Sequence, residues 1–196
     1  MSTVSVAVPH HRRIVAVDIE GSTTRTNPAK ARLRQVMYDL FEGALEASGI
    51  VKDHMDPLVD RGDGVMALIR PVDEAPMTLL LDTLLPTLSR LLAEHNERAP
   101  LQKLRLRAVV HAGEVHYDRQ GQFGEALDIT FRLLDAPEVK DILREAKAPL
   151  VLVVSGDIYR SVIRHGYEGI DCAAFEQLFT VTVSGQQHLG WTRVLP

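Results

Sequence analysis

Short runs of branched aliphatic residues that stop at glycine limit what this chain can fold into. The run IVAVDI, residues 14–19, precedes Gly21, and the run LVLVVS, residues 150–155, precedes Gly156. Each run is too short for a helix and rich in β-branched residues, which is typical of buried strands. Longer segments between such runs repeat apolar residues at three- and four-residue spacing, which predicts helices. We therefore expect an α+β protein with helices covering a sheet.

The same patterns predict the elements along the chain. Two hairpin-like pairs interrupt a strict βαβ succession, so the central sheet should be mixed or mainly antiparallel. The expected strands are 13–19, a hairpin over 55–69, 104–115 with its end at Gly113, a strand from 148, and a closing pair at 179–185 and 190–196. The expected helices are 27–49, capped by Asn27, 73–98, bent at Pro86, 126–134, one from 137, and 156–166, with a polar connection over 116–124.

Composition narrows the classes of protein. A chain of 196 residues with 45% hydrophobic residues suits one domain, expected over residues 12–196 after a flexible lead-in at 1–11. A net charge of −4 does not suit a duplex-binding surface, so no nucleic-acid partner is expected. Residues 77–92 are interrupted by Asp82 and Pro86, which argues against a membrane span. The single cysteine, Cys172, is expected to be a buried, inert thiol in the cytoplasm.

Two aspartates stand where elements end. Asp18 ends the first expected strand, and Asp63 lies at the tip of the expected hairpin. In a ferredoxin-like arrangement these segments are neighbours, so the two carboxylates can converge. Their repulsion becomes attraction when Mg²⁺ or Mn²⁺ lies between them. Taken singly, the Asp-x-x-Gly-Ser-Thr turn is more often a helix cap, and Gly-Asp-Gly more often a plain hairpin turn.

A third pair of charged residues lies on one expected helix. Asp128 and Arg132 are four residues apart, so both can face one ligand. The alternative is a surface salt bridge, which contributes only tenths of a kcal/mol.

With these motifs in order, the sequence resembles the catalytic domain of class III nucleotidyl cyclases, the family of adenylate and guanylate cyclases. The resemblance covers roughly residues 12–195. It rests on four segments: VDIEGST at 17–23, RGDGVMA at 61–67, LRLRAVVHAGEV at 104–115 and FGEALDITFRLL at 123–134. The resemblance implies the ferredoxin-like class III cyclase fold, a central mixed or antiparallel sheet flanked by helices.

The resemblance also implies roles for the marked residues. Asp18 and Asp63 would hold two Mn²⁺ or Mg²⁺ ions, with the Ile19 carbonyl as a further ligand. Arg132 matches the arginine that stabilises the transition state, and Asp128 stands where the family usually has a ribose-positioning asparagine. The turn that would cradle the triphosphate through its backbone amides consists of Glu20, Gly21, Ser22 and Thr23.

In that family the metal aspartates and the arginine helix belong to opposite subunits of a homodimer. The resemblance thus implies that a nucleoside triphosphate is cyclised to a 3′,5′-cyclic nucleotide and pyrophosphate in a site shared by two copies. A lone chain should be inactive.

The residues expected to contact the nucleotide base depart most from the pattern of the family. Purine-specific relatives place polar side chains where this chain has Val59 and, approximately, Gly121, and neither can hydrogen-bond a purine edge. Val59 has a plain alternative as a core strand residue. The pattern is similar to the bacterial pyrimidine cyclases of antiphage defence, which make cyclic UMP or cyclic CMP for a separate effector. We favour uridylate over cytidylate cyclase.

The closing segment departs from the family, so two further interpretations stay open. Where relatives often carry a phosphate-binding lysine, this chain offers Ser184, Gln186 and His188. Arginines that could substitute are Arg12, Arg13, Arg61 and Arg193. One alternative is a weakly catalytic or nucleotide-sensing cyclase-homology module. The other is an adenylate cyclase with an atypical base pocket.

Overall fold

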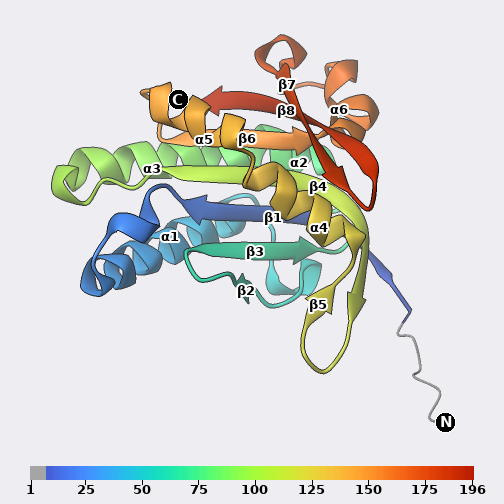
Figure 1. The fold of residues 1–196 in the computed structure, drawn as a ribbon, viewed down its shortest axis with the longest axis horizontal. Helices are drawn as coiled ribbons and strands as arrows, with labels where there is room; N and C mark the ends of the chain where they lie inside the picture. The colour runs from blue at the N-terminus through green and yellow to red at the C-terminus, as the bar shows by residue number, and fades with distance from the viewer. Residues whose placement is uncertain (1–7) are drawn as a thin grey trace.

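The computed structural model describes residues 8–196. Single helices and strands are interspersed along the chain with adjacent pairs of strands or of helices (Figure 1). The strands are β1 (His10–Ile19), β2 (Val59–Asp60), β3 (Gly64–Ile69), β4 (Leu106–Tyr117), β5 (Gln122–Phe123), β6 (Leu150–Ser155), β7 (Glu176–Val183) and β8 (Gln186–Leu195). The helices are α1 (Asn27–Ala47), α2 (Met77–Leu79), α3 (Leu85–Arg98), α4 (Glu125–Leu134), α5 (Pro137–Glu145) and α6 (Gly156–Ser161). No helix within residues 8–196 is long and apolar enough to cross a membrane.

The strands form one mixed sheet in the order β2-β3-β1-β4-β6-β8-β7, with β5 paired to the far end of β4. Neighbouring strands are antiparallel except β4 and β6, which run parallel. The chain between β4 and β6 crosses over through α4 and α5, as a parallel pair requires. The predicted α+β fold with a mixed, mainly antiparallel sheet is confirmed.

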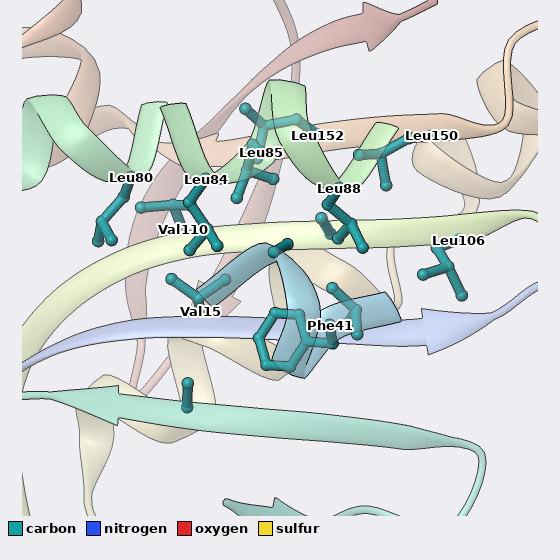
Figure 2. Packing of buried hydrophobic residues seen from close by; sticks show 14 of the residues in the cluster. Val15, Phe41, Leu80, Leu84, Leu85, Leu88, Leu106, Val110, Leu150 and Leu152 are labelled. Carbon is teal, nitrogen blue, oxygen red and sulfur yellow. The ribbon is translucent and has the colours of Figure 1, made fainter. Parts of the chain in front are cut away.

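Successive side chains along each strand point to opposite faces of the sheet, and both faces are apolar. Val15 and Val17 of β1 belong to a core cluster with α1 and α3, whereas Ile14 and Ala16 belong to a second cluster with α4 and α5. Figure 2 shows the leucines of α3 and of the turn before it packed against the strands, with Phe41 of α1 beside them. Each fully buried leucine contributes about 1.5–3 kcal/mol. The two pairs of helices therefore cover opposite faces of the sheet.

The long second helical segment differs from its predicted form. It begins at Met77 rather than residue 73, and a π-helical turn over Leu80–Leu84 separates α2 from α3. Pro86 stands in the first turn of α3, where its missing N–H is tolerated. The wider π turn thus replaces the simple bend predicted at this proline.

Strand β4 also continues past its predicted end. Gly113 lies inside the β1–β4 ladder, opposite Arg12, and the strand runs on to Tyr117 before pairing with β5. A Cβ atom on Gly113 would lie 2.7 Å from the Cβ of Ala126 in α4. Gly113 therefore allows α4 to pack closely against the sheet, and it does not end the strand. In Figure 1 the end of β4 and β5 project from the sheet as an arm.

Smaller differences concern element ends. The lead-in was predicted too long, because His10 and His11 already belong to β1, while residues 1–7 lie outside the described part. The cap of α1 is Thr26, so Asn27 is the first helical residue and not the cap. Cys172 is free but only half-buried, packed beside the first core cluster.

Candidate active site

The end of β1 positions Asp18 inside the molecule. Asp18 lies opposite Gly64 of β3 and Arg107 of β4, and its side chain follows Ile14 and Ala16 on the face that α4 and α5 cover. Only 9% of the residue is exposed. A carboxylate at such a position needs a charged or strongly polar partner.

Arg107 is that partner in this structure. Its Nε donates to Asp18 Oδ1 at 2.9 Å, and Nη2 donates to Oδ2, so the pair is bidentate. Burial raises the pKa of Asp18 to about 7, with Arg107 acting against the rise and the charges of Asp135 and Asp63 adding to it. The Asp18 carboxyl therefore sits where an additional positive charge is favourable.

The turn between β2 and β3 brings Asp63 to the same place. The Asp63 carbonyl accepts a hydrogen bond from the Ile19 N–H at 3.0 Å, and its carboxylate accepts one from Ser22 Oγ. Gly62 reaches a φ of 78°, and its N–H donates to Asp60 at 2.7 Å, which fixes the turn. Asp63 is thus held to the end of β1 on both its backbone and its side chain.

Gly64 allows the two strands to meet this closely. A Cβ atom there would lie 2.5 Å from the Val17 carbonyl oxygen and 3.2 Å from Asp18 Cβ. Backbone cannot yield to a methyl group as a flexible side chain can. The glycine after Asp63 is therefore required for placing both aspartates.

The segment after β1 forms a compact turn. Gly21 has a φ of 64°, and Ser22–Thr24 makes one 3₁₀ turn leading toward α1. Glu20 pairs with Arg105 at 3.3 Å, which ties the turn to the start of β4. Ser22 is buried against Asp63, whereas Thr23 is exposed.

Two cavities flank this turn, and its residues divide between them. Arg25 lines both, so the cavities adjoin. The turn cavity, about 310 Å³, is lined by Ile19, Ser22, Thr23, Arg25, Lys30, Leu33, Arg34, Gly62 and Asp63. The α5 cavity, about 480 Å³, is lined by Glu20, Gly21, Thr24, Arg25, Arg107, Lys140, Leu143 and Arg144.

The pair of aspartates at the end of β1 fits a hard divalent cation, with Asp63 lining the turn cavity and Asp18 lining neither cavity. Asp63 is close enough for its charge to add to the rise in the pKa of Asp18, of which burial is the main cause. Within residues 8–196 no group of three or more His, Cys, Asp or Glu side chains gathers as a metal cage. Two carboxylates with other oxygen ligands from backbone, water or substrate phosphate are the set that Mg²⁺ usually takes.

The other predicted site residues, on α4 and β2, line neither cavity. Asp128 and Arg132 are exposed on α4 and line neither cavity. The alternative of a surface salt bridge between them is wrong, because no ion pair joins them in the described chain. Val59 is half-buried in β2 and packs against the second core cluster.

The arginines suggested as substitute cations are all engaged elsewhere. Arg12 donates to Asp56 at 2.9 Å, and Arg13 donates to backbone carbonyls, including that of Val72 at 3.1 Å. Arg61 lies 4.0 Å over the Phe131 ring, and Arg193 lies 5.7 Å over Phe175. None of the four lines either cavity.

Sequence reasoning did not identify the cations that the structure places here. They are Arg107 in β4, Lys140 and Arg144 in α5, and Arg25 after the turn. A signal for Arg107 existed, because its alternation with leucine in LRLR puts an arginine on a buried strand face, where it needs an acid on the next strand. Lys140 and Arg144 gave no comparable signal on an exposed helix face.

The overall arrangement matches solved cyclase structures. The guanylyl cyclase Cya2 aligns with a TM-score of 0.62 at 15% identity, covering 96% of this chain and 95% of that one. The adenylate/guanylate cyclase/hydrolase from Silicibacter pomeroyi gives 0.62 at 17% identity, over 97% and 99%. The adenylyl cyclase CyaB from P. aeruginosa gives 0.62 at 12% identity, over 96% of both chains.

These similarities define the fold. No protein-family model and no curated protein matches the sequence. The chain has the fold of adenylyl and guanylyl cyclase domains along almost its whole length. The motif order that suggested this fold agrees with the observed order of elements.

Proposed function

We propose that the protein is a nucleotide cyclase that converts a nucleoside triphosphate to a 3′,5′-cyclic nucleotide and pyrophosphate. The observation that carries the proposal is the meeting of Asp18 and Asp63 at the end of β1, on a fold shared with cyclases. Both carboxylates adjoin a turn bordered by cationic side chains, as a triphosphate requires. The site thus combines a place for metal ions with a place for phosphate.

The chain's own residues prepare the site for an in-line displacement. Mg²⁺ or Mn²⁺, two ions per site, would supply charge neutralisation and make the 3′-hydroxyl easier to deprotonate. Asp18 and Asp63 would hold those ions, with the Ile19 carbonyl as a further ligand. Since Arg107 occupies both Asp18 oxygens, it must share or release that carboxylate when a cation binds. Glu20, Gly21, Ser22 and Thr23 line the two cavities and would border the phosphates.

A second copy of the chain completes the site. Arg132 and Asp128 are exposed and line neither cavity of their own subunit, which supports a homodimer in which α4 faces the partner's aspartates. Arg132 would stabilise the charge that develops on the α-phosphate. Asp128, a carboxylate that only accepts hydrogen bonds, would contact the ribose.

The proposed substrate is a pyrimidine nucleotide, UTP before CTP. Val59 packs among apolar side chains and offers no hydrogen bond to a purine edge, which supports this choice. We propose that cyclic UMP or cyclic CMP then acts as a second messenger in antiphage defence by binding a separate effector protein.

The test is to incubate the full chain with each of the four ribonucleoside triphosphates and Mn²⁺, and to identify products by mass. We expect cyclic UMP and pyrophosphate, with activity lowered at least about 100-fold by Asp63→Ala or Arg132→Ala. Asp39→Asn and Arg98→Ala, on exposed helix surfaces, serve as controls and should keep activity. Absence of any cyclic product in all four incubations would refute the proposal.

Two other functions are favoured by single observations. The Arg107 bond to Asp18 and the Asp128 departure favour a nucleotide-sensing module, which would bind nucleotide without turnover. The adenylyl and guanylyl cyclases among the structural relatives favour a purine substrate. Parallel incubation with ATP and UTP separates the purine alternative from the pyrimidine proposal.

A further inference from the structure

The α5 cavity is unusually basic for a chain with a net charge of −4. Arg25, Arg107, Lys140 and Arg144 line it, and its one acid is Glu20. Glu20 is already paired with Arg105 at 3.3 Å, outside the cavity lining. The cavity therefore concentrates positive charge, which favours a compact anion.

One buried donor at this cavity has no hydrogen-bond partner. Arg107 is 8% exposed, and its Nη1 makes no hydrogen bond. Its ion-pair partner, Asp135 Oδ1, is 4.0 Å away, too far for a hydrogen bond. Leaving a buried charged donor unsatisfied is costly, so an anion in the cavity would relieve that cost.

The two cations on α5 can be redirected to such an anion at small cost. Lys140 pairs with Asp135 at 3.4 Å, and Arg144 pairs with Asp141 at 2.6 Å. All four of these side chains are exposed, between 45% and 70%. Exposed pairs of this kind contribute about 0–1 kcal/mol each, so a multiply charged phosphate can replace the carboxylates.

We propose that Lys140 and Arg144 of α5, with Arg25, bind the terminal phosphates of the nucleotide and the pyrophosphate that leaves. The ligand class is a di- or triphosphate chain, and the inference rests on the proposed function for its place in the reaction. Arg25 lines both cavities, so one polyphosphate can extend from the aspartates across the turn to α5. Helix α5 thereby supplies cations in place of the lysine that the closing hairpin lacks.

The test measures binding of inorganic tripolyphosphate and pyrophosphate to the full chain by calorimetry. We expect K140Q/R144Q to raise the Kd by about tenfold or more, because two charge-assisted contacts are lost. The control K103Q/K147Q removes the same two charges at exposed positions outside the cavity and should change the Kd less than about twofold. Urea unfolding midpoints of all variants check that the fold is kept.

The outcomes separate this inference from the proposed function. Equal weakening by both double variants, or no binding of either anion by the wild-type chain, would overturn the α5 assignment. Specific loss in K140Q/R144Q together with no cyclic product would uphold the anion site and refute the cyclase. Normal turnover and unchanged pyrophosphate inhibition in K140Q/R144Q would uphold the cyclase and refute the role of α5.

Discussion

Asp18 and Arg107 are charged residues in the middle of an aliphatic sheet, and each is tolerated because of the other. The pair is bidentate and about nine-tenths buried, so removing one partner would leave an uncompensated charge. Such pairs seldom stabilise a fold more than apolar residues of the same size would. Under the proposed function, a metal ion bound to Asp18 would have to share the carboxylate with Arg107 or displace it.

His111, which is outside the proposed site, makes the stability of the protein depend on pH. It is buried beside Ser155, with 2.8 Å between Nδ1 and Oγ. Burial lowers the pKa of His111 from 6.5 to about 4, and His188 and His11 add to the decrease while Asp157 opposes it. The unfolded chain therefore binds a proton that the folded chain does not between these pH values.

The consequence for stability has a definite sign. The contribution of His111 is complete above pH 6.5 and is lost as the pH falls toward 4, by about 3 kcal/mol in the free energy of unfolding. His111→Asn should flatten this part of the stability curve. Urea titrations of both proteins from pH 4 to 7 measure it, and parallel curves would contradict the assignment.

Gly64 provides a second prediction at the residue scale. Gly64→Ala should lower the free energy of unfolding by about 1–3 kcal/mol, because the new methyl group meets the Val17 carbonyl at 2.5 Å. Gly43→Ala in α1 is the matched control, since its Cβ meets only Leu91 at an ordinary 3.9 Å. That change should stabilise the helix by about 0.5–1 kcal/mol. Urea denaturation compares the two, and equal effects would contradict the account.

At the scale of elements, the contact of α4 with β4 fixes where the Arg132 helix lies. Gly113 and Ala126 meet there, with 2.7 Å between Ala126 Cβ and a Cβ built on Gly113. Larger side chains at this point must move the helix from the sheet, and α4 would carry Arg132 with it.

A double-variant cycle tests that contact. Gly113→Ala should destabilise the protein by about 1–3 kcal/mol through overpacking, and Ala126→Gly by about 1 kcal/mol through helix propensity. Together they should cost less than the sum, because the second change removes the clashing methyl group. Unfolding free energies of the four proteins give the coupling. Strict additivity would show that α4 does not press on β4 there.

The sequence predicted most elements, and the exceptions have physical causes. The long apolar runs and helical periodicities located each main strand and helix because burial dictates their patterns. Strand β5 was missed because two residues are too few to show a periodic pattern. The end of β4 was misplaced because Gly113 is needed for packing against α4 and not for a turn. The meeting of Asp18 and Asp63 followed from element order. Lys140 and Arg144 were not found, since only tertiary structure assigns their neighbours, whereas the alternation of LRLR at the start of β4 was an unused signal for Arg107.

At the scale of the whole molecule, the proposed site needs two chains. Asp18→Ala and Arg132→Ala proteins should each be inactive, yet mixing them as exchanging dimers should restore about one quarter of wild-type activity, because half of the dimers keep one intact site of two. Product formation after mixing is the measurement. Verified mixed dimers that stay inactive would contradict a shared site.

The parallel pairing of β4 with β6 has a further consequence. Their crossover is one continuous stretch that carries Asp128, Arg132, Lys140 and Arg144, whereas Asp18 in β1 and Asp63 in the turn before β3 come earlier in the chain. Changes confined to residues 118–149 would therefore alter the proposed partner contact and the proposed phosphate site together, while both aspartates stay unchanged.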